Sequence, residues 1–294
     1  REDGFVMDDG TTARLDETHF VMTTTTAAAG PVMRHLEFIT QVHHPEWDVR
    51  IMSVTEQWAQ FAIAGPKSRD LVNGLVESPI DNESWPFMAC GPVRVAGIDA
   101  RLFRISFSGE HAYELAVPAR YGDALFRVLV KRAEALAGGA YGMEALNVLR
   151  VEKGHITHSE IHGRTTAFDI GMERMISSNK DCIGKTMAAR DGLLEDDREQ
   201  MVGFKPAGEI KKLTAGAHLY SEGAEAVPEN DQGYVTSAAF SPDFGHYIAL
   251  GFVRGGAARH GDRLRLVDAM RGIDTVVEVC PPVFIDPEGG RLRG

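Results

Sequence analysis

The sequence has 294 residues, and its hydrophobic (44%) and charged (25%) fractions are typical of a globular protein that folds in water. A chain of this length holds about two or three compact units. Its formal net charge of −11 repels nucleic-acid phosphates and anionic lipid surfaces, so neither nucleic acid nor a membrane is an expected partner.

Residues 1–90 alternate strand-like and helix-like stretches. Val32, Leu36 and Ile39, for example, recur at steps of three and four residues, as one face of a helix requires. Strand pairs that alternate with helices in this way predict the α+β fold class. The predicted elements are a strand at 4–7, a hairpin at 12–15 and 19–23, a helix at 27–41, strands at 48–56 and 58–64, and a helix at 68–76.

The second part of the chain changes character near residue 181. Before it, the pattern predicts a strand pair at 93–107, a strand at 113–117 and helices at 121–136 and 143–153. A charged stretch at 181–200 then favours a linker. The short strands beyond it are separated by Gly, Pro and Asp, which is typical of a small β-barrel or sandwich. They are predicted at 201–204, 217–221, 233–238, 248–252, 263–267 and 275–279.

Five segments that are weak alone carry the functional signal together. They are GFVMDD (4–9), ISFSGEHAYEL (105–115), LRVEKG (149–154), GYVTS with SP (233–237 and 241–242), and IALGFV (248–253). In this order and at these intervals they resemble the aminomethyltransferase (glycine cleavage T-protein) family across nearly the whole chain. VMDDG (6–10), TTTT (23–26) and PVFIDPEG (282–289) resemble the branch formed by the C-terminal region of the heterotetrameric sarcosine oxidase alpha subunit.

The resemblance implies a multi-domain cloverleaf of the α+β class around a folate site, with a small C-terminal β-barrel. It implies a middle, ferredoxin-like α+β domain at 1–90, the remainder of the first folate-binding domain at 91–180, a linker at 181–195 and the barrel at 196–294. The chain starts at Arg1 without a methionine and enters patterned sequence at once. We therefore expect a fragment or processed piece, with the N-terminal half of the first domain lying before Arg1.

Two adjacent aspartates, Asp8 and Asp9, follow the first predicted strand. Adjacent strand residues point to opposite faces, so only one of them lines a pocket. In the family a carboxylate after this strand faces the folate amines, and the motif register points to Asp9. The resemblance implies that Asp9 binds the folate and acts catalytically, by orienting the attacking amine and accepting its proton. Taken alone, the Asp-Asp-Gly motif is a polar turn.

Glu114 lies between Tyr113 and Leu115 in an apolar strand. A pterin ring presents a ring N–H beside an exocyclic amine, and a carboxylate matches that pair with two parallel hydrogen bonds. The family places its pterin-binding glutamate here, so the resemblance implies that Glu114 binds the cofactor. The alternatives are an exposed strand glutamate or a partner for Arg104. Tyr113 points the other way and is expected in the core.

Two further clusters have structural interpretations. Arg150 and Glu152 are expected in structural ion pairs, and Leu146 stands where the glycine cleavage branch commonly has an arginine, which argues against that branch. Three histidines and Glu160 fall close together, but their spacing of i, i+3 and i+7 fits one helix face poorly. We expect no metal site. The histidines are His155, His158 and His162.

The predicted function is a folate-dependent aminomethyltransferase-like enzyme domain of a sarcosine oxidase. It would convert the imine from sarcosine oxidation, or from a similar N-methyl amine, to 5,10-methylenetetrahydrofolate and glycine. No G-x-G-x-x-G follows a strand, so flavins and NAD are expected on other domains or on flavin-bearing subunits. Three widely spaced cysteines favour a reducing cytoplasm. The alternatives are a glycine cleavage aminomethyltransferase and a non-catalytic folate-binding or assembly domain.

Overall fold

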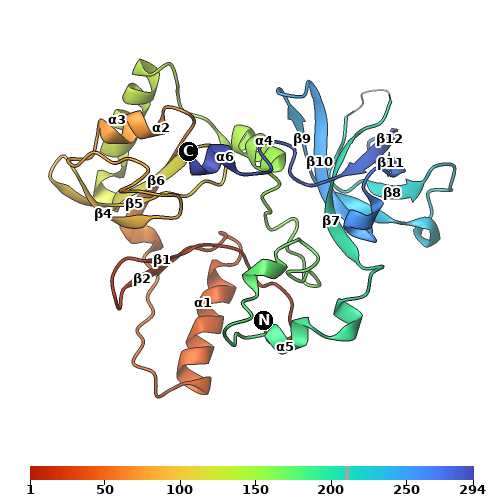
Figure 1. Cartoon of the computed structure of the whole chain (residues 1–294), viewed down its shortest axis with the longest axis horizontal. Helices are drawn as coiled ribbons and strands as arrows, with labels where there is room; N and C mark the ends of the chain where they lie inside the picture. The colour runs from red at the N-terminus through yellow and green to blue at the C-terminus, as the bar shows by residue number, and fades with distance from the viewer. Residues whose placement is uncertain (209–211) are drawn as a thin grey trace. The chain divides into compact units, whose positions relative to one another are not determined.

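The computed structural model describes residues 1–208 and 212–294, whose helices and strands are labelled in Figure 1. The chain divides into two compact units. Unit 1 comprises Arg1–Asp9 and Asn147–Pro287, whereas unit 2 comprises Gly10–Leu146 and Glu288–Gly294. Each unit is therefore built from two stretches that are far apart in the sequence. Among the described residues, no helix has the length and apolar character that a membrane span requires.

Unit 2 is built on a four-stranded antiparallel sheet with the order β3-β6-β5-β4. Side chains on one face of this sheet pack against Leu71 and Val72 of α2 and against Leu125 and Leu129 of α3. This packing follows from period-two alternation, which sends every second strand residue toward the helices. The elements are β3 (Trp58–Ala64), α2 (Ser68–Asn73), β4 (Cys90–Val95), β5 (Ile98–Phe103), β6 (Ala112–Pro118) and α3 (Gly122–Ala135).

The N-terminal part of unit 2 contains the predicted hairpin and helix. β1 (Thr12–Arg14) pairs with β2 (Phe20–Met22), and α1 (Ala29–Phe38) continues into a π-helical turn at Ile39–His43. The strand predicted at 48–56 is wrong. Among the described residues no strand pairs with this mostly exposed stretch, whose only regular element is a 3₁₀ turn at Thr55–Gln57. Alternating sequence without a neighbouring strand does not make a sheet.

Unit 2 also includes the last residues of the chain. Arg104, fully buried after β5, donates from Nη1 to the carbonyls of Ala112 (3.3 Å) and Leu292 (3.0 Å). Leu292 belongs to the short helix α6 (Gly290–Arg293), and Nη2 of Arg104 donates to the Arg293 carbonyl at 3.3 Å. The tail thus supplies acceptors that a buried guanidinium requires.

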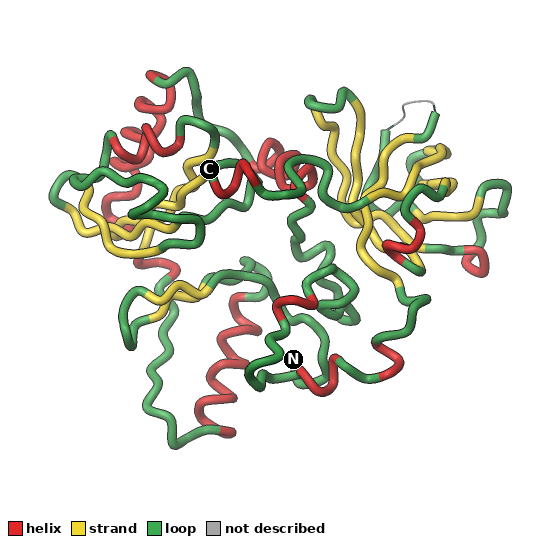
Figure 2. Tube along the Cα trace, viewed as in Figure 1, coloured by secondary structure: helices red, strands yellow, loops and turns green. Residues whose placement is uncertain are grey.

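Unit 1 contains a closed barrel with the strand order β10-β7-β12-β11-β8-β9, drawn as yellow strands in Figure 2. Apolar side chains two positions apart point into the core in three of these strands: Val202 and Phe204 of β7, Leu264 and Leu266 of β11, and Val277 and Val279 of β12. This alternation confirms the predicted barrel and, with unit 2, the α+β fold class. The strands are β7 (Glu199–Pro206), β8 (His218–Ser221), β9 (Gly233–Ser241), β10 (His246–Arg254), β11 (Arg263–Asp268) and β12 (Ile273–Cys280).

The remaining regular elements are short, apart from α4 (Met143–Lys153). The chain passes from unit 2 to unit 1 inside this helix, between Leu146 and Asn147. The expected linker at 181–195 contains α5 (Lys185–Ala188) and a 3₁₀ turn at Asp191–Leu193. The four-part division of the chain remains a proposal, and the predicted boundary between residues 90 and 91 passes through the single sheet that joins β3 to β6. Further 3₁₀ turns lie at Ala119–Tyr121, Glu173–Met175, Pro228–Asn230 and Gly256–Arg259.

A buried carboxylate connects α4 to the barrel within unit 1. The side chain of Glu160 is 0% exposed, and Arg150 of α4 donates to its Oε2 at 3.3 Å. Thr157 donates to the same oxygen from its backbone N–H (2.7 Å) and its hydroxyl (2.9 Å). The hydroxyls of Thr236 and Ser237 on β9 both donate to Oε1 at 2.6 Å. We refer to these five residues as the Glu160 network.

A β-bulge allows two consecutive strand residues to reach one carboxylate. Leu250 pairs with Ser237, but Gly251 pairs with Val235, so Thr236 is an extra residue on β9. A bulge breaks the alternation of side chains and redirects them. Without it, Thr236 and Ser237 would point to opposite faces of the barrel wall.

Substitution of Gly251 by alanine is expected to destabilise the barrel by about 1–3 kcal/mol, the usual cost of overpacking. A Cβ at Gly251 would lie 2.2 Å from the Tyr234 carbonyl oxygen and 3.0 Å from the Phe204 ring. Gly192→Ala in the same unit is the control, because a Cβ there meets no atom within 4 Å. Urea unfolding followed by circular dichroism measures both. Equal stability of the two variants would contradict the close packing at Gly251.

Candidate functional site

The candidate site in unit 2 lies on the sheet face that the helices leave uncovered. Tyr113, Leu115 and Val117 of β6 belong to the apolar core, so alternation sends Glu114 to the opposite face. Tyr113 is 0% exposed, which confirms its predicted core position. Glu114 is half-buried, and its direct cross-strand neighbour on β3 is Ala62. The carboxylate therefore stands between a small neighbour on β3 and Phe103, its direct neighbour on β5.

Gln60 of β3 is the hydrogen-bond partner of Glu114. Its side-chain Nε2 donates to Oε2 of the carboxylate in a close contact. Burial raises the pKa of the Glu114 carboxyl above its ordinary value, and the hydrogen bond from Gln60 opposes that rise. The pKa of Tyr141 is raised by burial and then by the charge of Glu114, which identifies Tyr141 as an electrostatic neighbour. Neither Gln60 nor Tyr141 was identified from the sequence.

The hydrogen-bond partner of Glu114 is Gln60 and not Arg104, which was the alternative partner considered from the sequence. Arg104, considered above as its partner, donates instead to backbone carbonyls and lies 3.2 Å from Nδ1 of His111. The guanidinium of Arg101 on β5 lies 3.8 Å from the centroid of the Trp58 ring. By strand alternation, Arg101 and Trp58 belong to the same helix-free face as Glu114. This face therefore combines an acceptor carboxylate with an aromatic and cationic pair.

The candidate aspartates lie in unit 1, in a segment that is not a strand. The predicted strand at 4–7 is wrong: the backbone N–H of Val6 donates to the Thr165 carbonyl (2.8 Å), but residues 5–10 form no regular element. The side chain of Val6 packs against the cluster of Ile156, Ile161, Ile170 and Phe252. The apolar pattern at 5–7 therefore reflects core packing without a neighbouring strand.

Asp8 is half-buried, whereas Asp9 is exposed and is the last residue of the first stretch of unit 1. On the N-terminal side of the pair, Gly4 packs so closely that a Cβ would lie 2.4 Å from the Ala188 nitrogen. On the C-terminal side, Thr11 donates its N–H to Thr23 Oγ1 (3.0 Å) within unit 2. The pair is thus held in a chain segment with anchored flanks. The assignment of the catalytic role to Asp9 remains a prediction.

The other charged residues singled out from the sequence have structural contacts. Arg150 forms the predicted ion pair, with Glu160, whereas Glu152 accepts a hydrogen bond from the Ser241 hydroxyl at 2.5 Å. The His162 ring packs edge-on against Phe252 with ring centroids 5.3 Å apart. Within residues 1–208 and 212–294, no group of three or more His, Cys, Asp or Glu side chains is arranged to hold a metal ion. The Glu160 carboxylate already accepts hydrogen bonds from five donor groups of the four other residues in its network.

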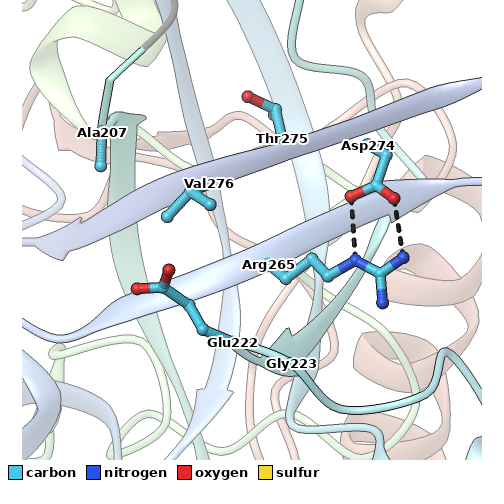
Figure 3. Close-up of a pocket in the computed structure, with 7 residues that line it drawn as sticks. All are labelled: Ala207, Glu222, Gly223, Arg265, Asp274, Thr275 and Val276. Atoms are coloured by element: carbon cyan, nitrogen blue, oxygen red, sulfur yellow. Dashed lines mark hydrogen bonds and ion pairs between the residues drawn. The ribbon is translucent and has the colours of Figure 1, made fainter.

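A hollow of about 290 Å³ on the barrel is a separate feature of unit 1 (Figure 3). Arg265 and Asp274 face each other along it through two hydrogen bonds of 2.9 and 2.7 Å. Arg265 also donates to the Ala224 carbonyl (2.8 Å), and Glu222 forms an ion pair with Arg263 at 3.1 Å. Because these charges neutralise each other, the hollow does not provide the lone carboxylate that the helix-free face of unit 2 provides.

Comparison with protein families gives two matches that together cover most of the chain. Residues 1–180 match the GCVT N-terminal domain, and residues 199–286 match the glycine cleavage T-protein C-terminal barrel domain. Among solved structures, the chain is similar to the glycine cleavage system aminomethyltransferase T from Bartonella henselae. The TM-score is 0.77 with 22% sequence identity, over 97% of this chain and 73% of that chain. That likeness shows the fold.

The relatives of the chain include two kinds of protein. The sarcosine oxidase subunit alpha of Rhizobium meliloti (strain 1021) is 48% identical, and that of Corynebacterium sp. (strain P-1) is 38% identical, each over 100% of this chain. The chain spans only 30% and 31% of their respective lengths. An aminomethyltransferase from Thermotoga neapolitana is 26% identical over 95% of this chain and 73% of its own length.

Proposed function

Because the chain belongs to the glycine cleavage T-protein (aminomethyltransferase) family, we propose that it is a tetrahydrofolate-dependent one-carbon transfer module. The observation that carries this proposal is the half-buried Glu114 carboxylate on the helix-free face of the unit 2 sheet. Its two oxygens suit a planar ring with two adjacent N–H donors, as the pterin of a folate has. A small neighbour, Ala62, favours the approach of such a ring.

We further propose that the module acts in an oxidase of the sarcosine type. The identity to sarcosine oxidase alpha subunits supports this assignment, since it extends over the whole chain at 48% and 38%. The methylene carbon of the imine made from sarcosine would pass to tetrahydrofolate, giving 5,10-methylenetetrahydrofolate and free glycine. The oxidation itself would occur at a flavin on another domain or subunit, in the cytoplasm.

The proposed division of work uses one carboxylate for binding and one for chemistry. Tetrahydrofolate supplies the two nitrogens that carry the one-carbon unit. Glu114 accepts the paired N–H groups of the pterin and fixes its orientation. Asp9 orients the attacking amine, takes up its proton and stabilises the positive charge that passes through the reacting group. The imine carbon forms one bond to each of the two folate nitrogens while both of its bonds to the glycine nitrogen break. The two protons that the folate nitrogens lose pass to the glycine nitrogen, which leaves as a free amine.

Asp9→Asn is expected to leave folate binding within about threefold of the unmodified protein while transfer falls about 10²–10⁴-fold, the usual contribution of a positioned acid–base group. Calorimetry with folinic acid measures binding by the chain. Formation of 5,10-methylenetetrahydrofolate is measured in the complete oxidase with sarcosine and tetrahydrofolate.

Asp8→Asn is the matched control, because it removes the adjacent carboxylate. If Asp8→Asn lowers transfer and Asp9→Asn does not, the catalytic role belongs to Asp8. If both variants bind folinic acid and neither slows transfer, the chain is a folate-binding or assembly domain. Failure of the unmodified chain to bind folinic acid would contradict the proposed function itself.

A further inference from the structure

Gln60 and Glu114 form a diagonal pair on adjacent antiparallel strands. The β3–β6 register places Gln60 opposite Ala116 and Ala62 opposite Glu114, so the two polar side chains are two positions apart on the same face. Diagonal neighbours of this kind are within reach of long side chains. The hydrogen bond from Gln60 Nε2 to Glu114 Oε2 spans this diagonal. Gln60 therefore restrains the side chain on which the proposed folate site depends.

The side chains beside this pair are small on the β3 side, whereas Phe103 of β5 lies directly opposite Glu114 on the other side. Alternation places Ala62 and Ala64 of β3, with Ala112 and Ala116 of β6, on the helix-free face beside Glu114. Ala62 is exposed, so the carboxylate is open above its direct neighbour. A planar heterocycle can therefore approach the carboxylate over Ala62, where a longer side chain would block it.

The carboxylate keeps enough acceptor capacity for a ligand after it binds Gln60. Each carboxylate oxygen has two lone-pair sites, so one hydrogen bond from Gln60 leaves both oxygens able to accept from a ligand. We propose that Gln60 is a positioning residue for the pterin site: its amide fixes the Glu114 carboxylate so that both oxygens face a planar ring that approaches over Ala62. This inference rests on the proposed function and identifies the residue that orients its anchor.

The amide also influences protonation. Burial raises the pKa of Glu114, and the hydrogen bond from Gln60 lowers it. Only the ionised carboxylate accepts two N–H donors, so affinity is full above the folded-state pKa of Glu114 and is lost as pH falls through it. Removal of the Gln60 amide raises that pKa further. The loss of affinity therefore begins at a higher pH in the variant than in the unmodified protein.

The test is calorimetric titration of folinic acid between about pH 5 and 8 on the chain and its variants. Gln60→Ala is expected to bind about tenfold more weakly at neutral pH, as for loss of one hydrogen bond to a charged group. The midpoint, which is the pH at which half of the affinity for folinic acid is lost, is expected to move to a higher value. Gln60→Glu adds a second carboxylate beside the first and is expected to move the midpoint further in the same direction.

The control is Gln57→Ala, an exposed glutamine at the start of the same segment whose side-chain amide contacts the Met52 sulfur and not Glu114. It should leave the affinity and the midpoint unchanged, and thermal unfolding should be alike in all variants. Tight binding by Gln60→Ala with an unmoved midpoint would overturn the positioning role while the proposed function stands. Absence of binding by the unmodified chain would overturn both.

Discussion

Replacement of Glu114 by alanine is expected to weaken folinic acid binding about 100-fold at neutral pH. The proposed pterin contact consists of two hydrogen bonds to a charged group, each worth about 1.5–3 kcal/mol. Allowing for partial exposure of the side chain, a total loss of about 3 kcal/mol corresponds to roughly that change in affinity. Glu114→Gln should lose nearly as much, because its amide presents an N–H donor to one of the two N–H groups of the ring.

The matched control is Asp99→Ala, which removes an exposed carboxylate from β5 in the same sheet; its pair with Arg94 is long, at 3.9 Å. It should bind folinic acid as the unmodified chain does, since a distant exposed charge contributes little. Calorimetric titration at one pH measures all three variants. Tight binding by Glu114→Ala would show that folate is held elsewhere in the chain.

Replacement of Glu160 by alanine is expected to lower the free energy of unfolding of unit 1 by about 3–5 kcal/mol, the usual cost of breaking a buried ion pair. The variant leaves the buried Arg150 without its counter-ion. It also removes the acceptor of the Thr157 N–H and of the Ser237 hydroxyl, while the Thr236 hydroxyl keeps the Leu250 carbonyl as an acceptor at 3.1 Å. Unpaired polar groups in an apolar interior are expensive, so the loss exceeds the worth of any single bond.

The two units allow this prediction to be measured selectively. All three tryptophans, Trp47, Trp58 and Trp85, lie in unit 2, so tryptophan fluorescence follows that unit, whereas far-ultraviolet circular dichroism also follows the barrel. In urea, Glu160→Ala should unfold first by circular dichroism, before the fluorescence changes. Glu222→Ala breaks an exposed ion pair of unit 1 and should cost less than about 1 kcal/mol. An equally small loss for Glu160→Ala would contradict the network's role.

Local pattern was sufficient for most of the secondary structure. The six barrel strands are short apolar segments separated by Gly, Pro and Asp. They and the strands of the unit 2 sheet were predicted near their observed positions. The apolar run at 4–7 and the alternating stretch at 48–56 have strand-like patterns too, yet they form no strand. A strand needs a partner, and its partner is set by the chain far away. The periodicity of one segment does not show whether another strand will lie beside it.

The site could be predicted only in part for the same reason. Alternation identified Glu114 as the residue facing away from the core, and the family resemblance suggested what it binds. Gln60 was missed because it is 54 positions away and reaches Glu114 only through the β3–β6 register. The Glu160 network was missed because a bulge places Thr236 and Ser237 on one carboxylate. Register and bulges are set by pairing, which single-strand periodicity does not specify.

The interleaving of the two units also governs how the protein is made. Val6 cannot donate to the Thr165 carbonyl until the ribosome has released residue 165, on the order of ten seconds later at about 5–20 residues per second. The first stretch of unit 2, Gly10–Leu146, leaves the ribosome earlier, but its buried Arg104 lacks the carbonyls of Leu292 and Arg293 until those residues emerge. Most multidomain chains finish their first domain during translation. In this chain neither unit is complete until nearly all of residues 1–294 have been synthesised.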